Sequence, residues 1–287
     1  MKKIFKRSLI ITGIIAGVFV LAFGLTFLKP NSEMPGPNVV KTEKTANSVQ
    51  ANKTNAKTIH VLTALCDNKY QGIVPVPAAI GDGQNPDTNL YWGCRYGIRT
   101  FFKKSKEWKL LETRKVSDII LERLVFKHAT KDYYLITDAY DGQYIKQCIK
   151  DFLNSSCGNQ KDTLQLDGKI INIGGNASLL AYIGHNGLMD FQLSETYSNT
   201  DNKKRDVIVL ACYSKRYFSP QLKTANVNPL VWTTNLMCPE AYTLHNALTG
   251  YVNRETNESI RKRAAAAYSQ YQKCSLKAAK GLLVTDW

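Results

Sequence analysis

A histidine and a cysteine each follow an apolar run in the second half of the chain. The first run ends in Ile183-Gly-His185, and the second, Val207–Ala211, is followed at once by Cys212. A strand that ends in this way delivers the next side chain to the edge of a sheet, where a substrate can reach it. A thiol beside an imidazole is the minimal pair for nucleophilic acyl transfer. The sequence therefore predicts that His185 and Cys212 are a catalytic base and nucleophile.

The elements around this pair predict an α/β fold. The runs Leu179–Ile183 and Val207–Ala211 are continuously apolar, which is typical of central strands in a parallel sheet. The range 141–153 carries apolar residues at helical spacing after a strand over 133–137, and such alternation favours a mostly parallel sheet flanked by helices. Further strands are expected over 59–65, 108–111, 119–126, 169–173 and 229–233, a long loop over 66–89, and helices over 90–102, 239–250 and 258–273.

Several polar residues are expected near the same sheet edge. Asp67 and Asn68 follow the first strand, Asp138 follows another, and Thr234 and Asn235 follow a third. Because ligands gather at the carboxyl ends of parallel strands, these residues are candidates for a substrate pocket, and the acids would suit a basic substrate side chain. The competing interpretation is that they cap helices and turns.

The two segments resemble motifs of the caspase-like cysteine peptidases. Tyr182-Ile-Gly-His-Asn-Gly187 is similar to the family's Tyr-Ser-Gly-His-Gly segment, and the strand ending at Cys212 resembles its hydrophobic strand ending in Ala-Cys. The order of histidine before cysteine also agrees, as does the strand, helix and helix that follow. The chain departs from the family in the inserted Asn186, in the short gap between the two residues, and in Lys215 where glycine is usual.

This resemblance implies a cysteine peptidase acting on peptides or proteins. Cys212 would attack the peptide carbonyl as a thiolate, and His185 would stabilise that thiolate and later protonate the leaving amine. Backbone N–H groups near Asn186 and Gly187 would hold the oxyanion. The departures favour a second interpretation, a non-catalytic caspase-like binding or scaffold module at the cell envelope. A third is another thiol acyl transfer, such as an amidase or transpeptidase reaction.

The N-terminus has the pattern of a membrane anchor. Lys2, Lys3, Lys6 and Arg7 precede residues 9–28, which carry no charge. Twenty residues at about 1.5 Å rise per residue span the hydrocarbon core of a bilayer. The sequence thus predicts a signal anchor over 1–28, a flexible linker over 29–57 and an extracytoplasmic domain over 58–287 at the cell membrane. Cleavage of the segment and secretion of the domain is the alternative.

Composition argues against other classes of site. The net charge is +15, but the basic residues are scattered, so a solvated surface is expected and a nucleic-acid partner is not. The seven cysteines contain no Cys-x-x-Cys spacing, and the four histidines lack paired acidic motifs, so neither a metal nor another cofactor is expected. An odd number of cysteines leaves at least one thiol unpaired outside the cytoplasm.

Overall fold

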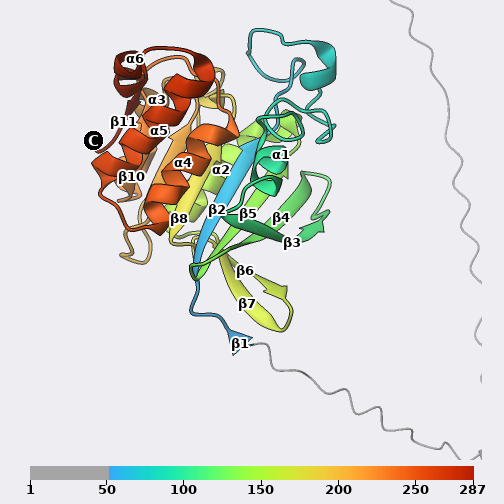
Figure 1. Cartoon of the computed structure of the whole chain (residues 1–287), viewed down its shortest axis with the longest axis vertical. Helices are drawn as coiled ribbons and strands as arrows, with labels where there is room; N and C mark the ends of the chain where they lie inside the picture. The colour runs from blue at the N-terminus through green and yellow to red at the C-terminus, as the bar shows by residue number, and fades with distance from the viewer. Residues whose placement is uncertain (1–51) are drawn as a thin grey trace, which may run out of the picture. The chain divides into compact units, whose positions relative to one another are not determined.

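The computed structural model describes residues 52–287, which are built around an eight-stranded sheet in the order β11-β10-β9-β8-β2-β5-β4-β3 (Figure 1). The strands from β10 to β5 in this order run parallel, and β11, β4 and β3 are antiparallel to their neighbours. The predicted α/β fold with a mostly parallel sheet is therefore confirmed. The strands are β2 (Lys57–Ala64), β3 (Trp108–Arg114), β4 (Ile120–His128), β5 (Tyr133–Tyr140), β8 (Leu179–Ile183), β9 (Asp206–Leu210), β10 (Asn228–Thr233) and β11 (Leu283–Val284).

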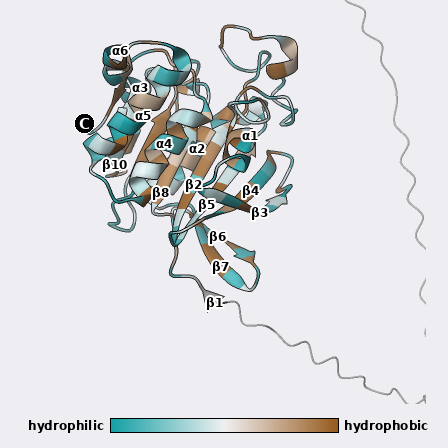
Figure 2. Ribbon diagram, in the orientation of Figure 1, coloured by the Kyte–Doolittle hydropathy of each residue, from teal (hydrophilic) through white to brown (hydrophobic). Residues whose placement is uncertain are grey.

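Helices bury both faces of this sheet, which explains why its central strands β8 and β9 are almost entirely apolar. One face packs against α1 (Ile98–Lys103), α4 (Ala241–Val252), α5 (Asn257–Gln272) and α6 (Leu276–Leu282). The other face packs against α2 (Ile145–Cys157) and α3 (Ser214–Thr224). Figure 2 shows hydrophobic residues along β2 and β8 and hydrophilic residues on the outer side of α5. Alternate residues of each central strand thus enter two separate cores.

A small second sheet lies beside β4 and β5. Strands β6 (Lys161–Leu166) and β7 (Lys169–Gly174) form a hairpin, and β1 (Asn52–Lys53) pairs in parallel with β7. Leu164 and Ile171 of the hairpin pack with Ile136 of β5 in a third hydrophobic cluster. Within residues 52–287, strand β1 thus precedes residue 58, where the domain was expected to start.

The helix predicted over 90–102 is wrong for its first eight residues, which form turns before α1. Asn89 explains the difference, because its Oδ1 accepts hydrogen bonds from the N–H groups of Cys66 and Tyr91, each at 3.1 Å. Side-chain bonds to nearby backbone compete with the hydrogen bonds of a helix. A Cβ at Gly93 would also lie 1.9 Å from the carbonyl oxygen of Asp87, so the turn requires glycine there.

Helix α4 continues through Gly250, which was predicted to end it. A Cβ at this position would lie 3.1 Å from Cδ of Arg263 and 3.2 Å from Cγ1 of Ile260. Gly250 therefore permits the close approach of α4 and α5. Helix α3 was not predicted, because its sequence is largely polar and contains Pro220, although Phe218 and Leu222 are buried.

The membrane prediction concerns another part of the chain. Within residues 52–287, no helix combines the length and apolar character needed to span a bilayer. The predicted anchor over 1–28, and most of the predicted linker over 29–57, lie outside the described residues.

Candidate active site

The register of β8 and β9 places His185 and Cys212 at the same edge of the sheet. Ile183 and Leu210 are paired across the two parallel strands, and each candidate residue lies two positions beyond its strand's partner. Both residues line one cavity of about 430 Å³. The structure therefore brings together the two residues that the sequence singled out.

His185 is held by a carboxylate that the sequence analysis missed. Its Nε2 lies 2.7 Å from Oδ2 of Asp190, at the end of the short 3-10 turn Gly187–Met189. The imidazole side chain is only 8% exposed, whereas that of Asp190 is 30% exposed. A carboxylate on Nε2 favours the tautomer that keeps its proton there. Nδ1, which makes no hydrogen bond in the described part of the chain, is then the basic nitrogen.

Asp190 also fixes the neighbouring long loop, because its Oδ2 accepts a hydrogen bond from the N–H of Gly72 at 3.0 Å.

The sequence contains a signal that could have identified Asp190 as a partner of His185. It follows the histidine by five residues in a segment that contains no strand pattern. A carboxylate at such short spacing after a candidate base is a natural orienting group.

The Cys212 sulfur contacts the backbone of Met237. The N–H of Met237 donates to Sγ at 3.4 Å, and Sγ lies 3.6 Å from the Met237 carbonyl oxygen. The next residue, Tyr213, adopts a left-handed conformation with φ of 50° and begins the turn into α3. The thiol is thus held at a sharp turn between a strand and a helix, with an N–H donor beside its sulfur.

Asn186 connects the two loops that carry the candidate residues. Its Nδ2 donates to the carbonyl oxygen of Cys212 at 2.6 Å, and its Oδ1 accepts from the N–H of Leu188 at 3.1 Å. This buried side chain holds the end of β9 against the loop after β8. The inserted residue that departs from the caspase-like pattern is therefore a brace for Cys212.

The backbone N–H of Gly187 does not occupy the position expected of an oxyanion donor. Its N–H donates to the carbonyl oxygen of His185 at 3.2 Å, and a Cβ here would lie 2.7 Å from the ring of Phe191. Neither Asn186 nor Gly187 lines the cavity, whereas Gly184, with φ of 147°, does. The N–H of Gly187 is occupied by a turn, and the residue allows Phe191 to pack closely.

Asp67 and Asn68 lie outside the cavity and stabilise the long loop. Oδ1 of Asp67 accepts from the N–H groups of Lys69 and Tyr70 at 2.8 and 3.1 Å. The Asn68 amide makes two hydrogen bonds with the backbone of Val76, at 2.8 and 2.9 Å. Of the two interpretations of this segment, the contacts agree with turn capping.

Asp138 is part of β5 and is fully buried away from the cavity. Arg123 donates to both of its carboxylate oxygens at 2.6 Å, and Nε2 of His60 lies 2.9 Å from Oδ2. Burial raises the pKa of this carboxyl, but the hydrogen bonds from Arg123 and His60 and the charge of Arg123 outweigh burial and lower the pKa to about 2. Asp138 is a structural anion in this arrangement.

Thr234 and Asn235 are exposed after β10, next to the cavity but outside it. Oγ1 of Thr234 donates to the carbonyl oxygen of Gly281 at 2.8 Å, and the Asn235 carbonyl accepts from the N–H of Tyr213 at 2.9 Å. The cavity wall begins one residue later, at Leu236. Leu236 and Met237 thus form an apolar wall where a polar one was expected.

The walls of the cavity are mainly apolar. Val74 is 88% exposed and Leu236 is 62% exposed, although both lie in polar loops, and such residues are a sequence signal for a binding surface. Glu240 supplies the carboxylate of the lining, but its Oε2 accepts from the hydroxyl of Tyr242 at 2.8 Å, and burial raises its pKa. The apolar lining residues are Ile73, Val74, Val76, Leu90, Met189, Leu236, Met237 and Pro239.

All seven cysteines are free thiols, and two of them line the cavity, Cys212 and Cys238. Burial, followed by the charge of Glu240, raises the pKa of Cys238. Burial raises the pKa of Cys66 to about 11 and also raises that of Cys148, and neither lines the cavity. Cys238 therefore offers a matched control for experiments on Cys212.

Comparisons with models of protein families, with curated proteins and with solved structures found no match. The chemistry of the site is therefore inferred from its own residues and their geometry.

Proposed function

We propose that this protein is a cysteine peptidase of caspase-like architecture, with Cys212 as nucleophile and His185 as general base. The observation that carries the proposal is that both residues line one cavity at the ends of adjacent parallel strands, while Asp190 orients the imidazole at 2.7 Å. Nucleophile, base and orienting acid are the three parts that activated thiols use. The order of the two motifs in the chain supports the same architecture.

The reaction follows from the free nitrogen of His185. Nδ1 accepts the thiol proton, and the Cys212 sulfur attacks the carbonyl carbon of a peptide bond. The tetrahedral adduct collapses as the imidazolium gives its proton to the leaving amine, which produces a thioester. Water then attacks the thioester with His185 as base, and the carboxylic acid and the thiol are released. The Met237 N–H, 3.4 Å from the sulfur, stabilises the negative charge before attack.

The cavity favours an apolar substrate side chain. Its volume of about 430 Å³ accommodates a side chain with part of a peptide backbone, and its walls are mainly aliphatic. The acids that would have suited a basic side chain are committed to other partners, since Asp138 pairs with Arg123 and Asp67 caps a turn. We therefore expect cleavage next to leucine, methionine or valine in preference to lysine or arginine.

The test is cleavage of a peptide library by the full-length protein. Cys212→Ala and His185→Ala should each lower kcat/KM by about 10³-fold or more. Nucleophile and base act as one catalytic unit, so removing either residue abolishes the function of both. Cys238→Ala removes the other cavity thiol and should leave kcat/KM within about twofold. Activity that survives in Cys212→Ala would exclude this cysteine as the nucleophile.

One observation favours a binding module as the second candidate. The Cys212 sulfur contacts both the N–H and the carbonyl of Met237, as a structural thiol would. Alkylation by iodoacetamide in Cys238→Ala separates the two functions. A thiolate nucleophile should react faster than the exposed thiol of a denatured control, whereas a structural thiol should react more slowly.

The same proposal places the domain on the outer side of a membrane. It rests on the basic residues before the uncharged run 9–28, which would keep the N-terminus in the cytoplasm. Protease added to intact cells should then digest the domain, and it should leave the domain intact if the orientation is reversed. Release of the domain into the medium would indicate cleavage of the segment.

A further inference from the structure

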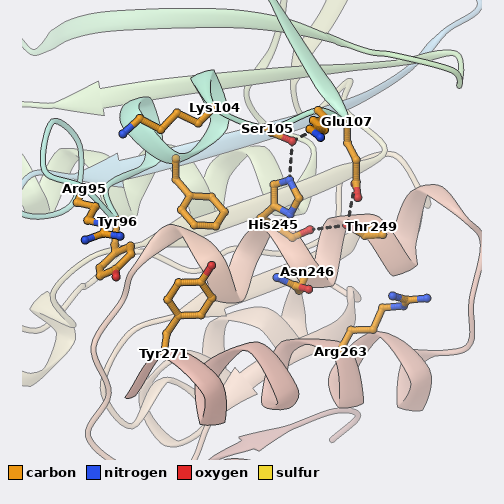
Figure 3. A pocket seen from close by; sticks show the side chains of 12 residues that line it. Arg95, Tyr96, Lys104, Ser105, Glu107, His245, Asn246, Thr249, Arg263 and Tyr271 are labelled. Carbon is orange, nitrogen blue, oxygen red and sulfur yellow. Dashed lines mark hydrogen bonds between the residues drawn. The ribbon is translucent and has the colours of Figure 1, made fainter. Parts of the chain in front are cut away.

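A second cavity, of about 610 Å³, lies between the segment around α1 and the helices α4 and α5 (Figure 3). It shares no lining residue with the cavity of His185 and Cys212. We call it the basic cleft, and its lining residues are Arg95, Tyr96, Phe101, Lys104, Ser105, Lys106, Glu107, His245, Asn246, Thr249, Arg263 and Tyr271.

The charges that line the basic cleft are unbalanced. Arg95, Lys104 and Lys106 form no ion pair with any carboxylate among residues 52–287, and Arg263 is paired with Glu255 at 2.6 Å. The one acid of the lining, Glu107, accepts a hydrogen bond from Oγ1 of Thr249 at 2.8 Å. Cations gathered in a concave site raise the local concentration of anions.

The walls of the cleft are rigid because aromatic rings pack behind them. Tyr271 stacks on Tyr242 with ring centroids 4.3 Å apart, and Tyr96 meets the edge of this pair at 5.3 Å from Tyr271. The guanidinium of Arg95 lies 5.3 Å from the centre of the Tyr96 ring. A ligand would thus meet a preformed surface and lose little free energy in ordering it.

The floor of the cleft offers neutral hydrogen-bonding groups. Nε2 of His245 is 2.7 Å from Oγ of Ser105, and burial lowers the pKa of His245, so the imidazole is neutral near pH 7. Asn246 uses one amide hydrogen on the carbonyl oxygen of Tyr242 at 2.9 Å, and its other hydrogen and its oxygen have no hydrogen-bond partner within residues 52–287. Figure 3 places Arg95 and Lys104 toward one end, with Asn246 and His245 farther along the floor.

We propose that the basic cleft binds a compact polyanion, a small molecule that carries phosphate or several carboxylate groups. Arg95, Lys104 and Lys106 pair with its charges, and Asn246 and Tyr271 contact its polar body. A small molecule fits because the cleft has the volume of ordinary small-molecule sites. A polyanion fits because three unpaired cations face the same space, and a guanidinium matches phosphate and carboxylate geometry with two parallel donors.

The experiment is calorimetric titration of the full-length protein with inorganic pyrophosphate and, separately, with citrate at low ionic strength. Arg95→Gln and Lys104→Gln should each weaken binding of at least one of these anions by about fivefold or more. Lys103→Gln is the matched control, because Lys103 is an exposed neighbour on α1 that does not line the cleft. It should change the dissociation constant by less than about twofold, and urea unfolding should show that all three variants remain folded.

Any of four outcomes would overturn the proposal. The first is that neither anion binds saturably, and the second is that Arg95→Gln and Lys104→Gln bind as tightly as the wild type. The third is that Lys103→Gln weakens binding as much as Arg95→Gln and Lys104→Gln do, which would mean diffuse charge attraction. Binding of an acidic peptide without binding of either small anion would likewise contradict it. The preferred anion distinguishes a phosphate ligand from a polycarboxylate ligand.

Cys212→Ala should bind the anion as the wild type does. The anion-binding proposal and the peptidase proposal are therefore tested independently.

Discussion

Two histidine–aspartate pairs of this protein, one inside the sheet on β2 and β5 and one in the loop after β8, have similar Nε2-to-carboxylate distances and very different surroundings. Nε2 of His60 lies 2.9 Å from Asp138, and Nε2 of His185 lies 2.7 Å from Asp190. The first pair is buried on every side, with Asp138 at 0% exposure and Arg123 bonded to both of its oxygens. The second pair borders a cavity that also contains a thiol.

The two pairs differ in whether the second imidazole nitrogen, Nδ1, is already hydrogen-bonded. His60 uses its second nitrogen as well, because Nδ1 accepts a hydrogen bond from the N–H of Gly174 at 3.0 Å. That ring is fully satisfied and connects β2 to the hairpin of β6 and β7. Nδ1 of His185 has no such partner within residues 52–287. A histidine–aspartate pair is thus an anchor when both nitrogens are bonded and a candidate base when one nitrogen is left free.

The largest expected effect is on stability, in the buried pair. Asp138→Asn should lower the free energy of unfolding by about 3–5 kcal/mol, because it leaves the Arg123 charge buried without its counterion. Asp190→Asn should cost about 1 kcal/mol or less, since its carboxylate is partly solvated. Urea unfolding of both variants measures the contrast. Equal losses would show that the two pairs are equivalent anchors.

The next effect is on activity, in the open pair. Asp190→Asn should lower kcat/KM by about 10²- to 10³-fold, because the amide no longer holds the imidazole in the tautomer with a basic Nδ1. KM should change little, since Asp190 does not line the cavity. Steady-state peptide cleavage by the folded variant tests this. If kcat/KM is unchanged, Asp190 is not the orienting group.

Lowering the pH should destabilise the protein by protonating Asp138, the carboxylate of the buried pair. Its pKa in the folded protein is about 2, below the value of about 3.9 in an unfolded chain, so the charged form stabilises the fold. The stabilisation by the charged form, about 2–3 kcal/mol, is complete above pH 5 and is lost as the pH falls from about 4 to 2. The difference in unfolding free energy between wild type and Asp138→Asn should shrink by about this amount across the range. A constant gap down to pH 2 would contradict the assignment.

The smallest effect concerns the brace beside the open pair. Asn186→Ala removes the hydrogen bond to the Cys212 carbonyl and should cost about 1–2 kcal/mol of stability, with a fall in kcat/KM of about tenfold as the thiol shifts. Asn199→Ala is the control, because Asn199 also connects two segments, through the carbonyls of Lys203 and Ala225, but does not line the cavity. It should reduce stability without reducing kcat/KM. If the two variants have equal kcat/KM, Asn186 has no specific role in positioning Cys212.

The sequence was informative where the signal is local. The apolar runs ending at Ile183 and Leu210 predict two buried parallel strands, and parallel strands must deliver the residues after them to one edge. Partners from distant segments were not predictable in the same way. Asp138 was expected after a strand, but β5 extends to Tyr140, and Arg123 of the neighbouring β4 pairs with the acid inside the sheet.

The walls of the cavity show the same limit. Loop residues such as Ile73 and Leu236 carry no periodicity that would place them. They line the same cavity as His185 because two separate segments, the long loop and the loop after β10, meet at the sheet edge. Asp190 holds that loop through the N–H of Gly72, a contact between positions 118 residues apart. Such closure depends on tertiary packing, which a single sequence pattern does not encode.

The short stretch from Leu236 to Thr249 serves both cavities. Its first five residues line the cavity of His185, and His245, Asn246 and Thr249 line the basic cleft on the other side of α4. Tyr242 lies between, with its hydroxyl on Glu240 and its ring against Tyr271. In evolutionary terms, substitutions at Tyr242 are constrained twice, because a change there disturbs Glu240 in the wall of one cavity and Tyr271 in the wall of the other.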